Sequence, residues 1–210
     1  LPLNLYAMQQ LQGESCEQNL VCDMRKSDLS RSGRVTATST LENSRRYAPS
    51  NVLDRSPDAA PGDFWGDPNT AWCEGVRGTG IGETIRIDFS APQPVAVISI
   101  SAGYEKSLEL FAKNSRIKRA LLTLSDGTQY QLVFRRHFYE MTYGKQSWQR
   151  MNSRYQEMNS PQMFVISPEG RPPRVIRWLE LSITETVTGS RYRDTCISRI
   201  DITPRWDMNF

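Results

Sequence analysis

The sequence offers few of the side chains that catalysis needs. Its 210 residues include a single histidine, His137, so a Ser-His-Asp or Cys-His arrangement would depend on that one imidazole. There is no P-loop, no Gly-x-Gly-x-x-Gly run that opens a helix after a strand, and no His-Glu-x-x-His motif. Acid pairs such as Glu105 with Glu109, or Asp63 with Asp67, are pairs that polar surfaces supply by chance. We therefore expect a protein that is not an enzyme.

Strong charge and long apolar runs are also lacking. The formal net charge is +3 and the acids are interspersed with the bases, which argues against nucleic-acid binding. No apolar run approaches the roughly 20 residues of a membrane span. The chain begins at Leu1 rather than Met, which indicates a trimmed chain or a mature product whose signal peptide has been removed. We expect a secreted, periplasmic or cell-surface protein.

Four cysteines are present, but no Cys-x-x-Cys pair, and the only histidine is remote from all of them, which argues against structural zinc. Cys16 and Cys22 are close together in sequence, whereas Cys73 and Cys196 are far apart. One local and one long-range disulfide is therefore the natural pairing. The other connectivities stay open, and so do four free, buried thiols in a reducing compartment.

From residue 34 onwards, short segments are either alternating or continuously apolar, and Gly, Pro, Asp or Ser bounds each of them. This pattern predicts strands at 34–40, 83–89, 95–102, 119–127, 128–134, 162–167 and 178–186. Asp126-Gly127, between two of these segments, is a strong hairpin signal. Many short strands without long helices predict an all-β fold, an antiparallel β-sandwich or jelly roll, over residues 34–210. Residues 1–33 are polar and indicate an N-terminal extension tied down by its own cysteines, Cys16 and Cys22.

Two insertions interrupt the strand pattern. Residues 55–66 contain too much Pro, Gly and Asp for regular structure, so we expect an ordered surface loop there. In residues 135–161, Trp148, Met151, Tyr155 and Met158 recur at three- and four-residue spacing. That spacing predicts an amphipathic helix that packs against the sandwich and covers a sheet edge.

Several motifs, in the same order, resemble those of one known family. The segment "PSNVLDRSP…GDPNTAWCEGVRGTGIGETIRIDF" resembles the opening of a discoidin-like, galactose-binding-like domain. The runs "WCEGVRGTGIGE", "GYEKSLELFAKNSRIKRALLTLSDG" and "YRDTCISRI" are similar to motifs of the glycan-binding-type domain found beside bacterial NAD glycohydrolases. The match covers about residues 49–203. The resemblance implies a β-sandwich of jelly-roll type that recognises ligands through loops at one end, while the glycohydrolase chemistry belongs to a separate domain.

The resemblance also implies a ligand site. Sugar recognition combines an aromatic platform for the apolar ring face with amide and guanidinium groups that read the hydroxyls. The segment after Gly103 and the last loop supply such side chains. The implied ligand-binding residues are Tyr104, Lys106, Asn114, Arg116, Tyr192 and Asp194. A structural ion pair between Arg116 and Asp194 is at least as good an interpretation of those two residues.

A structural calcium ion is the remaining site that the resemblance implies, since discoidin-like domains often hold a cation beneath the opening loop. The matching positions are Asp54, Asp67 and Thr70. Calcium takes about six to eight oxygen ligands. Arg199 stands where an acid is common in the family, so one expected ligand is replaced by a positive charge. No other cofactor is expected.

Trp72 and the glycines that follow it are most simply structural: the indole would close one end of the sandwich, and the glycines would permit a winding loop. We expect Glu74 and Glu83 to accept hydrogen bonds from backbone amides of that loop. Glu74 has no second titrating group, nucleophile or metal ligand beside it in sequence, so we do not expect it to act in catalysis.

We therefore interpret the chain as a non-catalytic carbohydrate-binding module for a glycan or glycoconjugate. A protein-interaction or structural subunit is the alternative, and it predicts an exposed apolar patch at Phe64, Trp65 or the Trp148 helix. A third hypothesis, an enzyme with an unrecognised carboxylate site, requires a cleft that contains an acid whose pKa is strongly shifted.

Overall fold

The structure is a computed structural model, and it describes residues 9–12, 14–15, 21–22, 33–54, 67, 69–134, 161–168, 170–204 and 208–209. Several of the sequence predictions lie outside these residues: the loop at 55–66 with Asp63, Phe64 and Trp65, the helix around Trp148, His137 and Cys16. In the part that the structure describes, no helix is long and apolar enough to cross a membrane.

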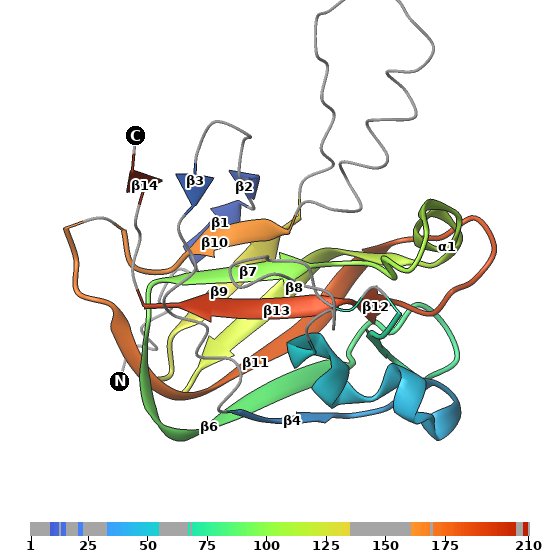
Figure 1. The fold of residues 1–210 in the computed structure, drawn as a ribbon, viewed down its shortest axis with the longest axis horizontal. Helices are drawn as coiled ribbons and strands as arrows, with labels where there is room; N and C mark the ends of the chain where they lie inside the picture. The colour runs from blue at the N-terminus through green and yellow to red at the C-terminus, as the bar shows by residue number, and fades with distance from the viewer. Residues whose placement is uncertain are drawn as a thin grey trace, which may run out of the picture.

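Two sheets form the body of the molecule (Figure 1). The six-stranded sheet has the order β1 (Gln9–Gln12), β9 (Gln129–Val133), β8 (Arg116–Leu124), β11 (Arg174–Val187), β6 (Thr84–Val95) and β4 (Gly33–Ala37). The four-stranded sheet has the order β13 (Arg199–Thr203), β7 (Val97–Ser101), β10 (Gln162–Val165) and β2 (Glu14–Ser15). Two short ladders pair β12 (Cys196–Ile197) with β5 (Trp72–Cys73) and β14 (Met208–Asn209) with β3 (Val21–Cys22). Among the named strands of the described residues, every pairing is antiparallel except β1 with β9.

Helical structure is sparse in the described residues. The α-helix α1 spans Leu108–Lys113, and Ser107 caps its first turn by accepting a hydrogen bond from the Leu110 amide. Three short 3-10 helices, η3 (Leu41–Asn43), η4 (Arg45–Tyr47) and η5 (Pro49–Leu53), follow β4. The predominance of antiparallel strands confirms the coarser part of the predicted fold class, a mostly β, antiparallel sandwich. The helical insertion at 135–161 and the disulfide-tied N-terminal extension stay predictions.

The core lies between the two sheets because strand side chains alternate with a period of two. In β6, Ile85, Ile87 and Phe89 are buried, while the residues between them are half-buried. From the other strands, the buried core includes Ile98, Ile100, Leu122, Leu124, Leu179, Leu181, Ile183, Ile200 and Ile202. The Asp126-Gly127 hairpin is also confirmed, with Gly127 at φ +81° in the turn between β8 and β9.

Two strands are longer than the sequence pattern predicted. β6 continues beyond Phe89 through Pro92 and Pro94 to Val95, and β11 begins at Arg174, four residues before the predicted strand. The proline-containing half of β6 pairs with β11, but its register with β4 ends at Phe89. Prolines are tolerated there because, within the described residues, no second ladder requires their missing N–H groups.

The polar N-terminal segment contributes strands that its sequence did not indicate. β1 adds to the six-stranded sheet beside β9, and β2 adds to the four-stranded sheet beside β10. Leu11 packs against the core, which anchors β1. The division of the chain at residue 33 stays a prediction.

Candidate functional site

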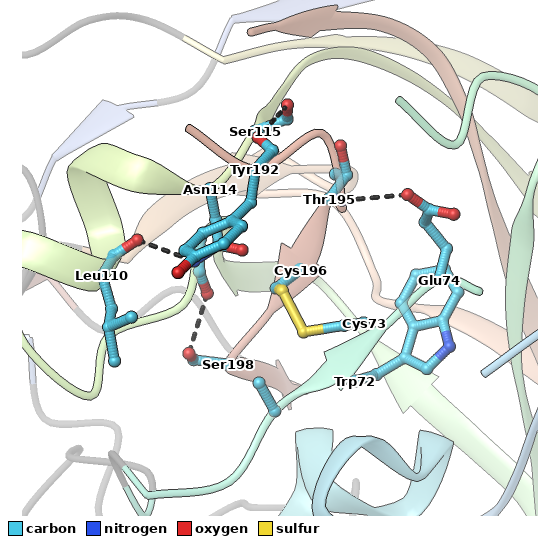
Figure 2. Close-up of a disulfide and its surroundings, with 12 residues drawn as sticks. Trp72, Cys73, Glu74, Leu110, Asn114, Ser115, Tyr192, Thr195, Cys196 and Ser198 are labelled. Atoms are coloured by element: carbon cyan, nitrogen blue, oxygen red, sulfur yellow. Dashed lines mark hydrogen bonds between the residues drawn. A yellow bond between two sulfur atoms is a disulfide. The ribbon is translucent and has the colours of Figure 1, made fainter. Parts of the chain in front are cut away.

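The end of the sandwich that carries the loops is held together by a disulfide. Cys73 and Cys196 lie directly opposite each other in the β5–β12 ladder, with a Cα–Cα distance of 4.1 Å and an S–S bond of 2.04 Å (Figure 2). The predicted long-range pairing is thereby confirmed. The pairing of Cys16 with Cys22 stays a prediction, because Cys16 lies outside the described residues.

Glu74, next to this disulfide, organises the loop that follows it. Its carboxylate is buried and accepts hydrogen bonds from the Val76 amide at 2.9 Å and the Thr195 amide at 3.0 Å. Figure 2 shows the carboxylate turned toward Thr195. Burial raises the pKa of Glu74, and the two amide hydrogen bonds partly offset that shift. The expectation that Glu74 accepts loop amides is confirmed.

Gly80 leaves the space that the Glu74 side chain occupies. A Cβ atom at Gly80 would lie 2.4 Å from Glu74 Cγ, and its backbone has a φ of +71°. Only glycine meets both conditions without strain. The Gly-rich sequence after Trp72 is therefore explained by the packing around Glu74 and by the path of the loop.

Trp72 is fully buried in the main core, and its Nε1 donates to the Ser39 carbonyl at 2.9 Å. Glu83 accepts hydrogen bonds from the hydroxyls of Thr38 and Ser39. The Glu83 carboxylate thus accepts from hydroxyl groups, whereas we expected it to accept from loop amides. Both side chains serve the scaffold at this end of the sandwich.

Tyr104 lies beneath the loops rather than on their surface. It is only 5% exposed and packs in a second small cluster with Ala71, Cys73 and Cys196. The half-buried ring of Tyr47 meets it edge to face, with ring centroids 6.1 Å apart. Burial raises the pKa of Tyr104. Tyr104 therefore presents little of its ring to a ligand in solution, while Lys106, two residues further on, is exposed.

Backbone hydrogen bonds join the loop after α1 to the loop after β11. The amides of Arg191 and Tyr192 both donate to the Lys113 carbonyl, at 3.1 and 2.8 Å. The Ser115 amide donates to the Asp194 carbonyl at 3.0 Å. Gly189 makes this approach possible, because a Cβ atom there would lie 2.2 Å from the Lys113 carbonyl oxygen. Two predicted site segments, Asn114–Arg116 and Tyr192–Asp194, are thus brought together.

Within this junction the predicted side chains have different surroundings. Asn114 is buried, and its amide donates to the Leu110 carbonyl at 2.8 Å, which closes α1 (Figure 2). Arg116 donates to the Phe111 carbonyl at 2.9 Å and lies over the Phe111 ring, 4.7 Å from its centroid. Tyr192 is exposed, and the Arg191 guanidinium lies 5.3 Å from its ring centroid.

Asp194 is half-buried, and burial raises its pKa, with a smaller contribution from the charge of Glu42. An ion pair between Asp194 and Arg116 stays a prediction. Among the six implied ligand residues, the structure places Lys106 and Tyr192 on the surface, Arg116 and Asp194 at half-buried positions, and Tyr104 and Asn114 inside.

The three implied calcium ligands lie close together. Thr70 Oγ1 donates to Asp54 Oδ2 at 3.4 Å, and Asp67 Oδ1 accepts from the Asn69 amide at 2.9 Å. Burial raises the pKa of Asp54, and the charge of Asp67 raises it further. No group of three or more His, Cys, Asp or Glu side chains in the described ranges could hold a metal ion. Two carboxylates and one hydroxyl fall short of the oxygen shell that calcium prefers, so the calcium site stays a prediction.

Arg199 is buried at the start of β13. Its Nη2 donates to Asp201 Oδ1 at 2.7 Å, and its Nε contacts the second oxygen of the same carboxylate. This bidentate pair compensates the charge that the arginine brings into the fold.

Glu105 is the acid whose pKa is most clearly perturbed. Burial raises the pKa of Glu105 to about 8, although the charge of Arg199 and a hydrogen bond with Ser101 act in the opposite direction. The enzyme hypothesis required such an acid in a cleft. Glu105 interacts with the strand residues Ser101 and Arg199. Glu109, its possible catalytic partner, is exposed and bound to Lys113. This arrangement accounts for the shifted pKa by burial in the scaffold.

Tyr47, which contacts Tyr104, was not among the predicted site residues, and neither were the two arginines that flank Tyr192. "RRYAPS" before the Asn51-x-x-Asp54 motif could have indicated Tyr47 as an aromatic residue in a loop. Nothing in the sequence showed that this loop would pack on Tyr104.

The sandwich, its opening loops and the cross-linked loop end define a discoidin-like domain. The model of the family described as NAD glycohydrolase translocation F5/8 type C domain matches residues 27–203, and the chain belongs to this family. The resemblance seen in the sequence is thereby confirmed. A search of curated proteins gives no match.

A solved carbohydrate-binding module has the same fold at low sequence identity, and one solved fucosidase is similar over part of its length. The family 32 CBM from C. perfringens NanJ, in complex with galactose, is 13% identical, with a TM-score of 0.50 over 84% of this chain and 96% of that one. A Ruminococcus gnavus GH29 fucosidase in complex with fucose is 13% identical, with a TM-score of 0.48 over 87% of this chain. This chain covers 27% of the length of that fucosidase.

Proposed function

We propose that this domain is a non-catalytic module that binds a glycan or glycoconjugate through the loops at its disulfide end. The observation that carries the proposal is the junction of the loops after α1 and β11. There the exposed ring of Tyr192 lies beside the Arg191 guanidinium. Arg116 and Asp194 belong to the same two segments, which backbone hydrogen bonds join. An aromatic surface with guanidinium and carboxylate groups around it is what sugar recognition requires.

Two further findings support this proposal. The fold is that of a module solved with galactose, and the family name associates such domains with the translocation of NAD glycohydrolases. We propose that the domain accompanies such an enzyme and attaches it to a glycosylated surface. The buried Cys73–Cys196 disulfide suits an oxidising compartment, in agreement with a secreted, periplasmic or cell-surface location.

A glycan array tests the proposal with the purified domain and two variants. Tyr192→Ala removes the exposed ring, and Val175→Ala removes a 63% exposed side chain from β11, away from the loops. The unchanged domain and Val175→Ala should bind the same glycans. Tyr192→Ala should bind them about tenfold or more weakly, as truncation of a central aromatic contact does. Binding to no glycan, or equal binding by all three proteins, would contradict the proposal.

A protein-binding role is the second candidate, and one observation favours it. Val76 and Ile81, in the loop that Glu74 organises, are 37% and 61% exposed. Exposed apolar side chains on a loop of this kind suit a contact with another protein. Ile81→Ser should then weaken complex formation with the accompanying enzyme and leave the glycan-array profile unchanged.

A further inference from the structure

Basic side chains gather where β8, the end of β11 and the loop after β11 meet. The first residues of β8 pair with the last residues of β11, with Arg116 opposite Val187 and Arg119 opposite Glu185. The loop that follows β11 is hydrogen-bonded to the end of α1, where the Lys113 carbonyl accepts from two of its amides. We call this region the basic corner: its basic residues are Lys113, Arg116, Lys118, Arg119, Arg191 and Arg193, and its acidic residues are Glu109, Glu185 and Asp194.

The acids of the basic corner leave an excess of positive charge. Glu109 is paired with Lys113. Glu185 is shared by Lys118 and by Arg119, whose Nε lies 3.1 Å from a carboxylate oxygen. This sharing is possible because the register between β8 and β11 shifts on both sides of Glu185, which lets two consecutive residues of β8 reach one carboxylate.

Four of the six basic side chains of the corner are accessible, while Lys113 and Arg116 are half-buried. The Lys118 and Arg119 side chains are 48% and 43% exposed, and Arg191, Tyr192 and Arg193 are all exposed. Exposed ion pairs of this kind contribute little to stability, so their cations can exchange one carboxylate for another anion at small cost. The basic corner therefore offers several guanidinium and ammonium groups beside one exposed aromatic ring.

We infer that the glycan bound at this end of the domain is anionic, a linear chain that carries sulfate or carboxylate groups. The inference rests on the proposed function and names its ligand class. The loop that carries Arg191 and Arg193 adjoins the start of β8, because the Ser115 amide donates to the Asp194 carbonyl. Strand residues advance about 3.3 Å each, so Arg116 to Arg119 alone span about 10 Å. Bases spread over two adjoining segments match repeated anionic groups better than one isolated group, and the planar guanidinium group binds such oxyanions in a bidentate manner.

A membrane surface suits the basic corner less well. The large hydrophobic side chains that the described residues expose are Val76, Ile81, Val175 and Tyr192, and only Tyr192 belongs to the corner. A peripheral membrane site combines basic residues with a larger apolar surface that enters the interface. The single ring between two arginines is better placed to stack on a sugar.

Binding to heparin, measured by calorimetry at two salt concentrations, tests the inference, with lactose as the neutral probe. The double variant Arg191→Gln/Arg193→Gln removes two charges from the basic corner. Its matched control, Arg34→Gln/Arg177→Gln, removes two exposed arginines from β4 and β11. The corner variant should bind heparin about tenfold or more weakly, the loss expected for one or more charge-assisted contacts, while the control binds as the unchanged domain does.

The variant Glu185→Gln should change heparin affinity in the opposite direction to the corner variant. It frees Lys118 and Arg119 from their shared carboxylate and should strengthen heparin binding, with a steeper loss as salt is added. Melting temperatures of all variants show whether each protein is folded.

Each outcome decides the inference. Binding of lactose or other neutral array glycans without heparin overturns the anionic ligand class and leaves the proposed function standing. Binding of neither probe nor any array glycan overturns both. Tighter binding to phosphatidylserine vesicles than to heparin, or an equal loss in the corner variant and its control, also overturns the inference. Salt-sensitive heparin binding that only the corner variant loses supports it.

Discussion

The Glu74 carboxylate accepts a hydrogen bond from the Thr195 amide, 3.0 Å away in space and 121 residues further along the chain. The Glu74 amide also donates to the Thr195 carbonyl at 3.2 Å, so main chain and side chain both hold the two segments together. Thr195 Oγ1 in turn donates to the Thr79 carbonyl at 2.9 Å. The loop after Trp72 is therefore fixed against the loop that carries Tyr192.

Glu74→Gln should lower the free energy of unfolding. A glutamine has one acceptor oxygen, so either the Val76 amide or the Thr195 amide would face an NH2 group. Loss of one charge-assisted hydrogen bond costs about 1.5 to 3 kcal/mol. Urea denaturation measures the change, with the exposed Glu42→Gln as control. A Glu74→Gln protein of unchanged stability that no longer binds its ligand would show that this residue belongs to the binding site.

Gly80→Ala and Gly82→Ala separate packing from backbone conformation. Both glycines have positive φ, +71° and +96°, but only at Gly80 would a Cβ atom overlap the Glu74 side chain. Gly82→Ala should cost about 1 to 2 kcal/mol for the left-handed backbone alone. Gly80→Ala should cost clearly more, because Glu74 must move away from its amides. Equal losses in thermal melts would show that the packing at Gly80 is unimportant.

The Cys73–Cys196 disulfide closes a loop of 123 residues. In the chain-entropy model, removing it by the double change Cys73→Ala/Cys196→Ala should cost about 5 kcal/mol of stability. Peptide mapping of the unreduced protein should show this linked pair. Two free thiols at these positions, or a double variant as stable as the unchanged protein, would contradict the structure.

The sequence was informative where local patterns decide the structure. The alternation in "TIRIDF" predicted the strand in which Ile85 and Ile87 are buried, and Asp126-Gly127 located a hairpin. It was less informative where distant segments meet. Proline normally ends a strand, so the continuation of β6 to Val95 depended on the register with β11. β1 has too few apolar residues to indicate a strand, and it forms because β9 offers a parallel edge.

The same limit applies to the candidate site. Tyr104 and Tyr192 are both aromatic residues in polar loops, and their sequence surroundings do not reveal that one is buried and the other exposed. Tyr47 and the disulfide cover Tyr104, and both contacts come from residues more than 20 positions away. Arg191 and Arg193 become part of the candidate site only because the loop that carries them contacts the end of α1, which the sequence does not reveal.

Chelation should leave the melting temperature unchanged. Asp54 and Asp67 already have hydrogen-bond partners in Thr70 and Asn69. Arg199, where the resemblance led us to expect an acid, is paired with Asp201. A ligand that binds only the native state would raise the melting temperature by mass action. Scanning calorimetry with EDTA and with added calcium checks this expectation. A rise of several degrees with calcium, abolished in Asp54→Asn, would establish the metal site.

Glu105 should make the domain less stable as the pH rises from about 4.5 to about 8. Burial raises the pKa of this carboxyl to about 8 in the folded protein, against an ordinary value of 4.5. Between these two values the folded chain holds a proton that the unfolded chain has lost. The stabilisation that the protonated Glu105 carboxyl contributes is therefore complete below the pKa that this group has in the unfolded chain. It is lost as the pH rises through the pKa that the group has in the folded protein.

The variant Glu105→Gln keeps the shape of the protonated side chain and cannot ionise, so its free energy of unfolding should not include this loss. Other acids also make the free energy of unfolding depend on pH. It falls with rising pH where the pKa is raised, at Glu74, Asp54 and Asp194. It rises with pH where the pKa is lowered, at Asp126, Glu109 and Glu185. The difference between the unchanged protein and Glu105→Gln, measured by urea denaturation at pH 5 and about pH 8.5, isolates Glu105. The variant should gain a few kcal/mol at the higher pH relative to the lower, at about 1.4 kcal/mol per pKa unit. Parallel pH profiles for the two proteins would show that the carboxyl is ionised and accommodated in the folded state throughout this range.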